Sequence, residues 1–306
     1  MKISVYDSWN KKFSGPIAEH WEAMGHEVVF NKQYDEPADI AFYYQSDNVA
    51  VDGVPKTINA KRIFVQVVDI ECWAGQAYAV DWTKVDGCIF MAQHIKDMVE
   101  GSTPSILGIP RKIIKPGIDT QKFYQRPPVQ FSEAPIRKIA YVVGDRRIWD
   151  VKRLDIAFQL LRDLMDTTDK IWQLHVRGTY STHQQYNAYC KHLEKDLKLS
   201  GNVVWEEARV EDLSAWLDDK DYFLLPSTKE VFSYATAEAM SKGIKPIIGN
   251  WQSAKDTWGE FVCETYGQML AELTKGKYEP DKYRKYIVEN YEQERYLKQI
   301  DEFIGL

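Results

Sequence analysis

The sequence has 306 residues, of which 44% are hydrophobic and 27% are charged, and its formal net charge is −6. This length suits two domains of about 150 residues better than one ordinary core. No apolar run approaches the ~18 residues of a membrane span, and the acidic balance argues against a general nucleic-acid binder.

The composition also bears on redox state, metals and location. The six histidines show no metal-ligand spacing, and no C-x-x-C pair occurs among the four cysteines, Cys72, Cys88, Cys190 and Cys263. We therefore expect buried thiols, and neither a disulfide framework nor a zinc site. The opening MKISVYDSW lacks the basic region and apolar core of a signal peptide, so we expect a cytoplasmic protein without stable membrane insertion.

The first part of the chain alternates short apolar runs with amphipathic stretches. Strands are predicted at 2–7, 26–30, 38–44, 61–69 and 85–91, and helices at 15–25 and 92–101. Alternation of this kind predicts a parallel sheet with helices on both faces.

The alternation stops at 124–138, where three prolines and few apolar residues indicate a linker, and it then resumes. Strands are predicted at 139–144, 171–178, 202–206, 221–227 and 245–249, and helices at 151–164, 183–197, 210–219 and 234–243. We predict an α/β protein of two doubly wound, Rossmann-like domains: 1–125, a linker at 126–138, and 139–280, with a helical tail at 281–306. Ligands of such sheets bind beyond the carboxyl ends of the strands, so the expected site is a cleft between the domains.

The stretch PSTKEVFSYATAEAMSKGIKP holds two glutamates, Glu230 and Glu238, eight residues apart. Glu230 directly follows a predicted strand, and a helix begins just beyond it. The helix begins near Phe232, Ser233 and Tyr234. Free backbone N–H groups and the helix dipole at this end favour the binding of an anion such as a diphosphate. Glu230 is then placed to accept hydrogen bonds from sugar hydroxyls, and Glu238 from a ribose. The structural alternative for Glu230 is a capping box formed by S-T-K-E.

This region resembles the donor-binding motif of the retaining GT-B glycosyltransferases of the GT4 family (glycosyl transferases group 1). That motif reads P-S, then E-x7-E, then E-A-M-x-x-G-x-P-V-I. The matching residues are Pro226, Ser227, Glu230, Glu238, Ala239, Met240, Gly243, Pro246, Ile247 and Ile248. The resemblance implies that Glu230 contacts the donor sugar and Glu238 the nucleotide ribose. It also implies a GT-B fold, two Rossmann-like domains facing across a cleft, with the tail helix crossing back to the first domain.

Three other segments resemble the same family in the same order: MGHEVVF, IIKPGIDTQKF and YVVGDRRIWDVKRLDIAFQLL. In the third segment, the family places an arginine and a lysine that neutralise the donor diphosphate. Lys152 matches the lysine, and either Arg146 or Arg147 matches the arginine, with Arg147 favoured. In the family, the loop corresponding to WEEARVEDL holds the nucleobase, which implies donor-binding roles for Arg209 and Val210. The alternative is that this loop only begins a helix.

The chain departs from the family pattern at several positions. Arg153 stands where a glycine follows the family's lysine. Val231 and Ser233 stand where the family often has glycines after the first glutamate, so side chains crowd the donor pocket. Gly15 is what remains of an N-terminal glycine loop near the donor phosphates or the acceptor. Asp69 and Glu71 stand where many members have an acceptor-side histidine, and the alternative for both is a helix-capping or loop role.

Together these features predict a retaining glycosyltransferase that moves a sugar from a nucleotide-diphosphate donor to an acceptor hydroxyl. The predicted catalytic residues are Arg147, Lys152 and Glu230. The resemblance implies a UDP- or GDP-sugar as substrate, no required metal or cofactor, and an acceptor that is a glycan, a lipid or modified DNA. The alternatives are a phage-type DNA-base glycosyltransferase and a non-catalytic nucleotide-sugar-binding protein. A dehydrogenase is excluded because no G-x-G-x-x-G follows an early strand.

Overall fold

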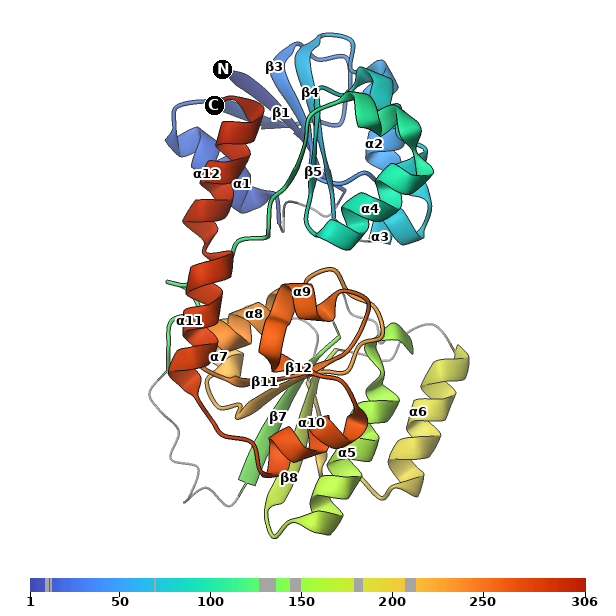
Figure 1. Ribbon diagram of the computed structural model, residues 1–306, viewed down its shortest axis with the longest axis vertical. Helices are drawn as coiled ribbons and strands as arrows, with labels where there is room; N and C mark the ends of the chain where they lie inside the picture. The colour runs from blue at the N-terminus through green and yellow to red at the C-terminus, as the bar shows by residue number, and fades with distance from the viewer. Residues whose placement is uncertain are drawn as a thin grey trace. The chain divides into compact units, whose positions relative to one another are not determined.

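The computed structural model describes residues 1–8, 11, 13–68, 70–126, 136–143, 150–178, 184–206 and 213–306. The chain divides into two compact units (Figure 1). Unit 1 consists of Met1–Gly117 and Gln293–Leu306, and unit 2 consists of Ile118–Glu292. The helical tail is therefore shared between the two units.

Unit 1 contains a six-stranded, fully parallel sheet in the order β2-β1-β3-β4-β5-β6. Its strands are β1 (Lys2–Tyr6), β2 (Glu27–Phe30), β3 (Ala38–Tyr43), β4 (Ala60–Val67), β5 (Gly87–Phe90) and β6 (Arg111–Ile113). Its helices are α1 (Gly15–Ala23), α2 (Asn48–Gly53), α3 (Ile70–Trp73), α4 (Gln93–Ser102) and α12 (Gln293–Ile304). The strand order reverses between β1 and β3, which is the reversal point of a flavodoxin-like sheet.

Helices cover both faces of this sheet, with α1 and α12 on one face and α2, α3 and α4 on the other (Figure 1). Trp21 of α1 packs edge-on against Phe42 of β3, and its indole N–H donates to Asp301 of α12 at 2.8 Å. Ile300 of α12 is fully buried in the same core. A Cβ on Gly117 would lie 2.8 Å from the backbone Cα of Gln293. The Pro-Gly of the IIKPGIDTQKF segment therefore allows α12 to approach closely.

Unit 2 contains a second parallel six-stranded sheet, in the order β12-β11-β10-β7-β8-β9. Its strands are β7 (Ile136–Val142), β8 (Ile171–Arg177), β9 (Val203–Glu206), β10 (Tyr222–Leu225), β11 (Lys245–Gly249) and β12 (Val262–Cys263). Its helices are α5 (Leu154–Thr167), α6 (Gln184–Asp196), α7 (Leu213–Leu217), α8 (Tyr234–Ser241), α9 (Ala254–Trp258), α10 (Tyr266–Thr274) and α11 (Pro280–Tyr291). The order reverses between β7 and β10, as in a Rossmann sheet.

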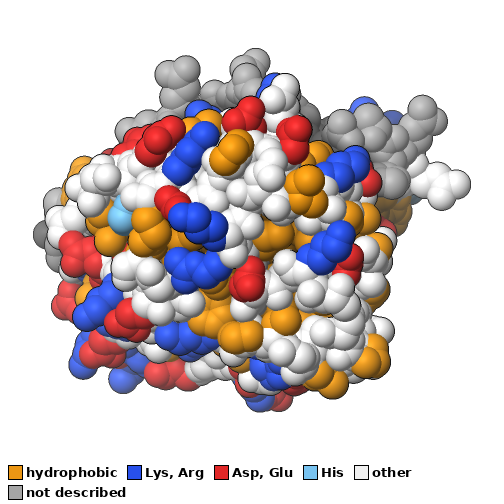
Figure 2. Space-filling view, turned by 90° about the horizontal axis from the view of Figure 1, so that it is seen from above, with side chains coloured by type: hydrophobic (Ala, Val, Ile, Leu, Met, Phe, Trp, Pro, Cys, Tyr) orange, Lys and Arg blue, Asp and Glu red, His pale blue; other side chains and the backbone are white. Residues whose placement is uncertain are grey.

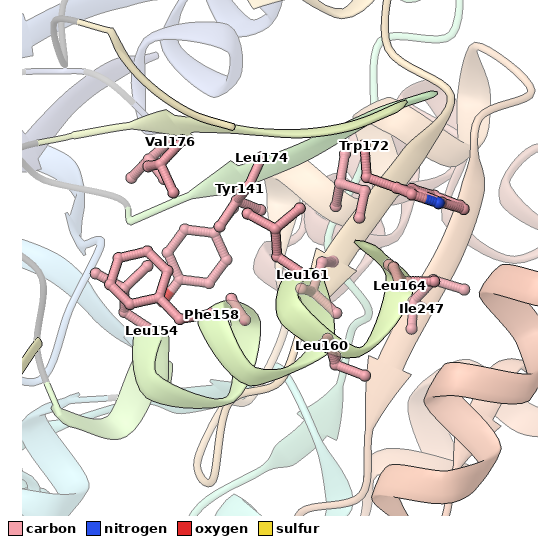
Figure 3. Packing of buried hydrophobic residues seen from close by; sticks show 14 of the residues in the cluster. Tyr141, Leu154, Phe158, Leu160, Leu161, Leu164, Trp172, Leu174, Val176 and Ile247 are labelled. Carbon is pink, nitrogen blue, oxygen red and sulfur yellow. The ribbon is translucent and has the colours of Figure 1, made fainter. Parts of the chain in front are cut away.

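The core of unit 2 forms where α5 lies on the sheet (Figure 3). Leu154, Phe158, Leu161 and Leu164 recur at helical spacing on one face of α5 and are each fully buried. They pack against residues from neighbouring strands, Tyr141, Leu174, Val176 and Ile247 among them. This packing fixes the direction in which α5 leaves the carboxyl end of β7.

The structure confirms the α/β class with two doubly wound sheets. β7 begins at Ile136, inside the expected linker, and 127–135 lie outside the described residues. Unit 2 begins at Ile118 rather than near 139. The four cysteines are all buried thiols, as the sequence predicts. No helix in the described part of the chain has both the length and the apolar character needed to cross a bilayer.

Candidate active site

The candidate site lies at the reversal point of the unit 2 sheet. β7 and β10 are parallel neighbours, with Ile139 opposite Tyr222, so the segments that follow them leave the same edge of the sheet. Lys152 ends a short 3-10 turn beyond β7, and Glu230 lies five residues beyond β10. The fold thereby brings together two predicted catalytic residues that are 78 positions apart in the sequence.

Glu230 is held by two hydrogen bonds that both reach the same carboxylate oxygen. The Nζ of Lys152 donates to Oε1 of Glu230, and the Oγ of Ser227 donates to this Oε1 at 2.8 Å. Glu230 is only 7% exposed and Ser227 2% exposed. A buried carboxylate is stabilised by hydrogen-bonded partners, and Glu230 has a charged one and a hydroxyl.

Lys152 is itself anchored from two sides. The Tyr141 hydroxyl donates to the carbonyl oxygen of Lys152 at 2.8 Å, and the backbone N–H of Thr228 donates to the carbonyl of Val151 at 2.9 Å. Burial raises the pKa of Tyr141 well above its ordinary value, so the phenol stays protonated and remains a donor. The turn that carries Lys152 is thus tied to β7 and to the segment that follows β10.

The capping-box alternative for Glu230 does not match the structure. Helix α8 begins at Tyr234, and its N-cap is Ser233, whose Oγ accepts from the backbone N–H of Thr236 at 3.4 Å. Glu230 precedes this cap by three residues, and its carboxylate accepts from side chains instead. Capping of the amino end of α8 therefore does not explain the position of Glu230.

The amino end of α8 carries no acidic residue in its first turn, which leaves the positive end of the helix dipole unneutralised by its own sequence. The Phe232 ring stacks on Trp258 at 5.3 Å between centroids and lies 4.9 Å from the ring of Tyr291. The side chain of Phe232 therefore belongs to an aromatic cluster. Tyr234 is half-buried, as is Glu238 in the second turn of α8.

A family model described as "Glycosyl transferases group 1" matches residues 131–304, which is more than half of the chain. The chain belongs to the glycosyl transferases group 1. It is therefore a glycosyltransferase, and donors of this family are nucleotide-sugars. A comparison with curated proteins finds no match to this chain.

Solved structures that resemble this group 1 glycosyltransferase share its whole length at low identity. HepE from Anabaena, solved with UDP and glucose, is 13% identical with a TM-score of 0.76, and the match covers 100% of this chain and 99% of HepE. A glycosyltransferase from Rickettsia africae is 12% identical with a TM-score of 0.72, covering 99% of this chain and 98% of that one. Sucrose-phosphate synthase from Thermosynechococcus elongatus is 13% identical with a TM-score of 0.69, covering 100% and 98%. These matches establish the two-domain GT-B fold.

One departure of this glycosyltransferase from the family pattern has a structural account. Arg153, in place of the family's glycine, has a φ of +55°, a left-handed conformation that glycine adopts more readily. Its guanidinium donates to Asp155 at 3.0 Å, through Nε and through Nη2. The Tyr186 hydroxyl also donates to Asp155, at 2.9 Å. This network holds the strained residue that directly follows Lys152.

The remaining predicted residues fall into two groups. Five lie outside the described residues: Asp69, Arg146, Arg147, Arg209 and Val210. Two belong to unit 1: Gly15 is the first residue of α1, and Glu71 is fully buried in α3. The Glu71 carboxylate accepts from the backbone N–H of Val68 at 2.5 Å, which supports the end of β4 locally. An acceptor-side role for Glu71 remains a prediction.

The sequence indicated Ser227 only as a matched position of the family motif and as the first residue of the S-T-K-E capping box, and it gave no indication of Tyr141. The S-x-x-E spacing of Ser227 and Glu230 was the available sequence signal for their contact. For Tyr141 no sequence signal existed, because its partner is a backbone carbonyl. Among the residues that the structure describes, no group of three His, Cys, Asp or Glu side chains is arranged to hold a metal ion.

Proposed function

We propose that this protein transfers a sugar from a nucleotide-diphosphate donor to an acceptor hydroxyl with retention of the anomeric configuration. The observation that carries the proposal is the pairing of Lys152 with Glu230 beyond the carboxyl ends of β7 and β10. A cation and a carboxylate side by side match the two halves of an activated sugar, since one attracts phosphate and the other accepts sugar hydroxyls.

In the proposed reaction, the bond between the anomeric carbon and the diphosphate breaks while the acceptor oxygen attacks from the same face. Negative charge grows on the departing diphosphate. Lys152, the amino end of α8 and Arg147 or Arg146 would stabilise that charge. The leaving phosphate oxygen takes the proton of the acceptor hydroxyl, so no separate protein base is needed. Exclusion of water from the closed site would limit donor hydrolysis.

The other donor contacts follow from the family resemblance and from the geometry of α8. Glu238 would accept hydrogen bonds from the two ribose hydroxyls. The backbone N–H groups at Ser233 and Tyr234 would receive phosphate oxygens. The base would be a uracil or a guanine, held by the loop that contains Arg209 and Val210. Residues of unit 1, with Gly15, Asp69 and Glu71 as the candidates, would meet the acceptor.

The acceptor is proposed to be a glycan or a lipid-linked saccharide in preference to DNA. The face shown in Figure 2 carries lysines and arginines interspersed with carboxylates and small hydrophobic areas, not a continuous basic field. The formal net charge of −6 does not favour a polyanionic acceptor. Tight binding to duplex DNA that weakens steeply with added salt would contradict this choice.

A thermal-shift screen of UDP-, GDP- and ADP-sugars tests the donor class, because a ligand that binds the native state raises Tm by mass action. Glu238→Ala should abolish most of the shift, whereas Glu264→Ala, a surface carboxylate in the same unit, should preserve it. A shift that survives Glu238→Ala would remove the ribose assignment. The anomeric configuration of the product, read by NMR, tests retention directly, and an inverted product would overturn it.

A further inference from the structure

We propose that Ser227 is a positioning residue that fixes the Glu230 carboxylate so that its second oxygen, Oε2, receives the hydroxyls of the donor sugar. This inference rests on the proposed function and adds to it the identity of the receiving atom and the group that aims it. Ser227 would act through Glu230 without touching the donor.

The first support is the distribution of contacts on the carboxylate. Both donors, Ser227 and Lys152, reach Oε1. Within the described residues, no other group donates to the Glu230 carboxylate. An ionised carboxylate has acceptor sites on both oxygens. Oε2 therefore keeps its full capacity for a ligand while Oε1 anchors the side chain.

The second support is the different character of the two anchors. The side chain of Lys152 is 20% exposed, and a diphosphate would compete with Glu230 for its ammonium group. Ser227 is 2% exposed and its hydroxyl is uncharged, so a phosphate attracts it only weakly. Ser227 can thus keep Glu230 oriented when Lys152 turns toward a diphosphate.

The third support is the rigidity of the segment that carries Ser227. It lies two residues beyond β10, whose last residue, Leu225, pairs with β11. The next residue, Thr228, donates its backbone N–H to Val151 beyond β7. A positioning group is effective when its own backbone is held in this way.

The experiment measures by calorimetry how much the sugar adds to the affinity for the nucleotide. This increment is expressed as the ratio of the Kd for UDP to the Kd for UDP-glucose. GDP and GDP-mannose are measured as a second pair. Ser227→Ala should reduce this increment about tenfold, the loss typical of one hydrogen bond to a charged group. The affinity for the nucleotide alone should stay unchanged. Ser227→Thr, which keeps the hydroxyl, should restore the increment. Ser241→Ala removes another buried hydroxyl of unit 2, bonded to the Phe123 carbonyl at 2.7 Å, and should leave the increment intact.

A double-mutant cycle with Glu230→Ala decides whether Ser227 acts through Glu230. In the Glu230→Ala background, Ser227→Ala should have no further effect on the increment. Additive losses, or equal weakening of nucleotide and nucleotide-sugar by Ser227→Ala, would overturn the inference and leave the proposed function standing. A wild-type protein that binds nucleotide and nucleotide-sugar equally would also overturn it. A wild-type protein that binds no nucleotide in either pair would overturn the proposed function itself.

Discussion

The two units build the same kind of parallel sheet twice, but different side chains stand at the two reversal points. In unit 2, a cation and a buried carboxylate pair beyond the strands, Lys152 with Glu230. In unit 1, beyond β1 and β3, the Ser8 hydroxyl donates to Gln45 at 3.1 Å and also to Asp47. Sheet geometry therefore makes both edges available to ligands. The two edges differ in charge, because the edge in unit 2 carries an ion pair and the contacts at the edge in unit 1 involve a hydroxyl, an amide and a carboxylate.

The largest expected effect tests whether the two units have separate cores. Phe158→Ala should lower the free energy of unfolding of unit 2 by about 3–5 kcal/mol, and Ile300→Ala that of unit 1 by about 2–5 kcal/mol. Each side chain is fully buried in the core of its own unit. Hydrogen exchange of peptides from each unit should accelerate in the mutated unit alone.

The matched controls for this pair are exposed isoleucines. Ile171 in unit 2 is 52% exposed and Ile58 in unit 1 is 75% exposed, so truncating either to alanine should change stability little. If one core substitution accelerated exchange equally in both units, the division into two cores would be wrong.

A large effect on activity is expected from removing the cation that distinguishes unit 2. Lys152→Ala should lower kcat/KM for transfer by about 100-fold to 1000-fold, because the growing diphosphate charge loses a preorganised partner. Lys170→Ala, which removes an exposed lysine of the same unit, should retain activity. Near-normal turnover by Lys152→Ala would move the diphosphate site away from the reversal point of this sheet.

A smaller effect is expected from replacing two glycines, one in each unit, at which another segment of the chain approaches the backbone closely. A Cβ on Gly117 would lie 2.8 Å from Gln293 in unit 1, and one on Gly243, where φ is +78°, would lie 2.8 Å from Pro280 in unit 2. Either change to alanine should destabilise its own unit by about 1–3 kcal/mol, measured by urea unfolding. Gly108→Ala is the control, because nothing lies within 4 Å of its added Cβ. Full stability of Gly117→Ala would mean that α12 can shift at no cost.

The smallest effect expected is a pH dependence confined to unit 2. Burial lowers the pKa of His175 below its ordinary value of 6.5, and Glu206 at 3.2 Å opposes that shift only in part. The unfolded chain therefore binds a proton more readily than the folded unit. The stability that unit 2 gains by keeping His175 neutral is complete above about pH 6.5 and is lost as the pH falls below that value.

His175→Gln should flatten the dependence of unit 2 stability on pH between about pH 7 and about pH 5.5, measured by hydrogen exchange. Unit 1 peptides in the same sample provide the reference. An unchanged pH profile in the variant would show that other groups cause the acid sensitivity.

Strong patterns in the sequence predicted most of the fold, and weak ones did not. Longer strands such as β4, with eight residues, and β8, with seven, stand out, whereas β6 has three residues and β12 two, too few to show a period. The tail read as one helix, but Glu292 leaves the helical conformation, with ψ at 134°, and separates α11 from α12. That break coincides with the change of unit at Glu292 and Gln293, which only packing reveals.

By itself, the sequence determined the α/β class, the family and the identities of Lys152 and Glu230 as candidates, because these depend on local periodicity and on motifs of nearby residues. Only the tertiary structure decided that Lys152 and Glu230 meet, that Ser227 and Tyr141 support them, and that α12 completes the core of unit 1. The physical reason is that such contacts join residues far apart in the chain. Strand order and core packing decide which of these residues meet in space, and no single segment of the sequence determines either one.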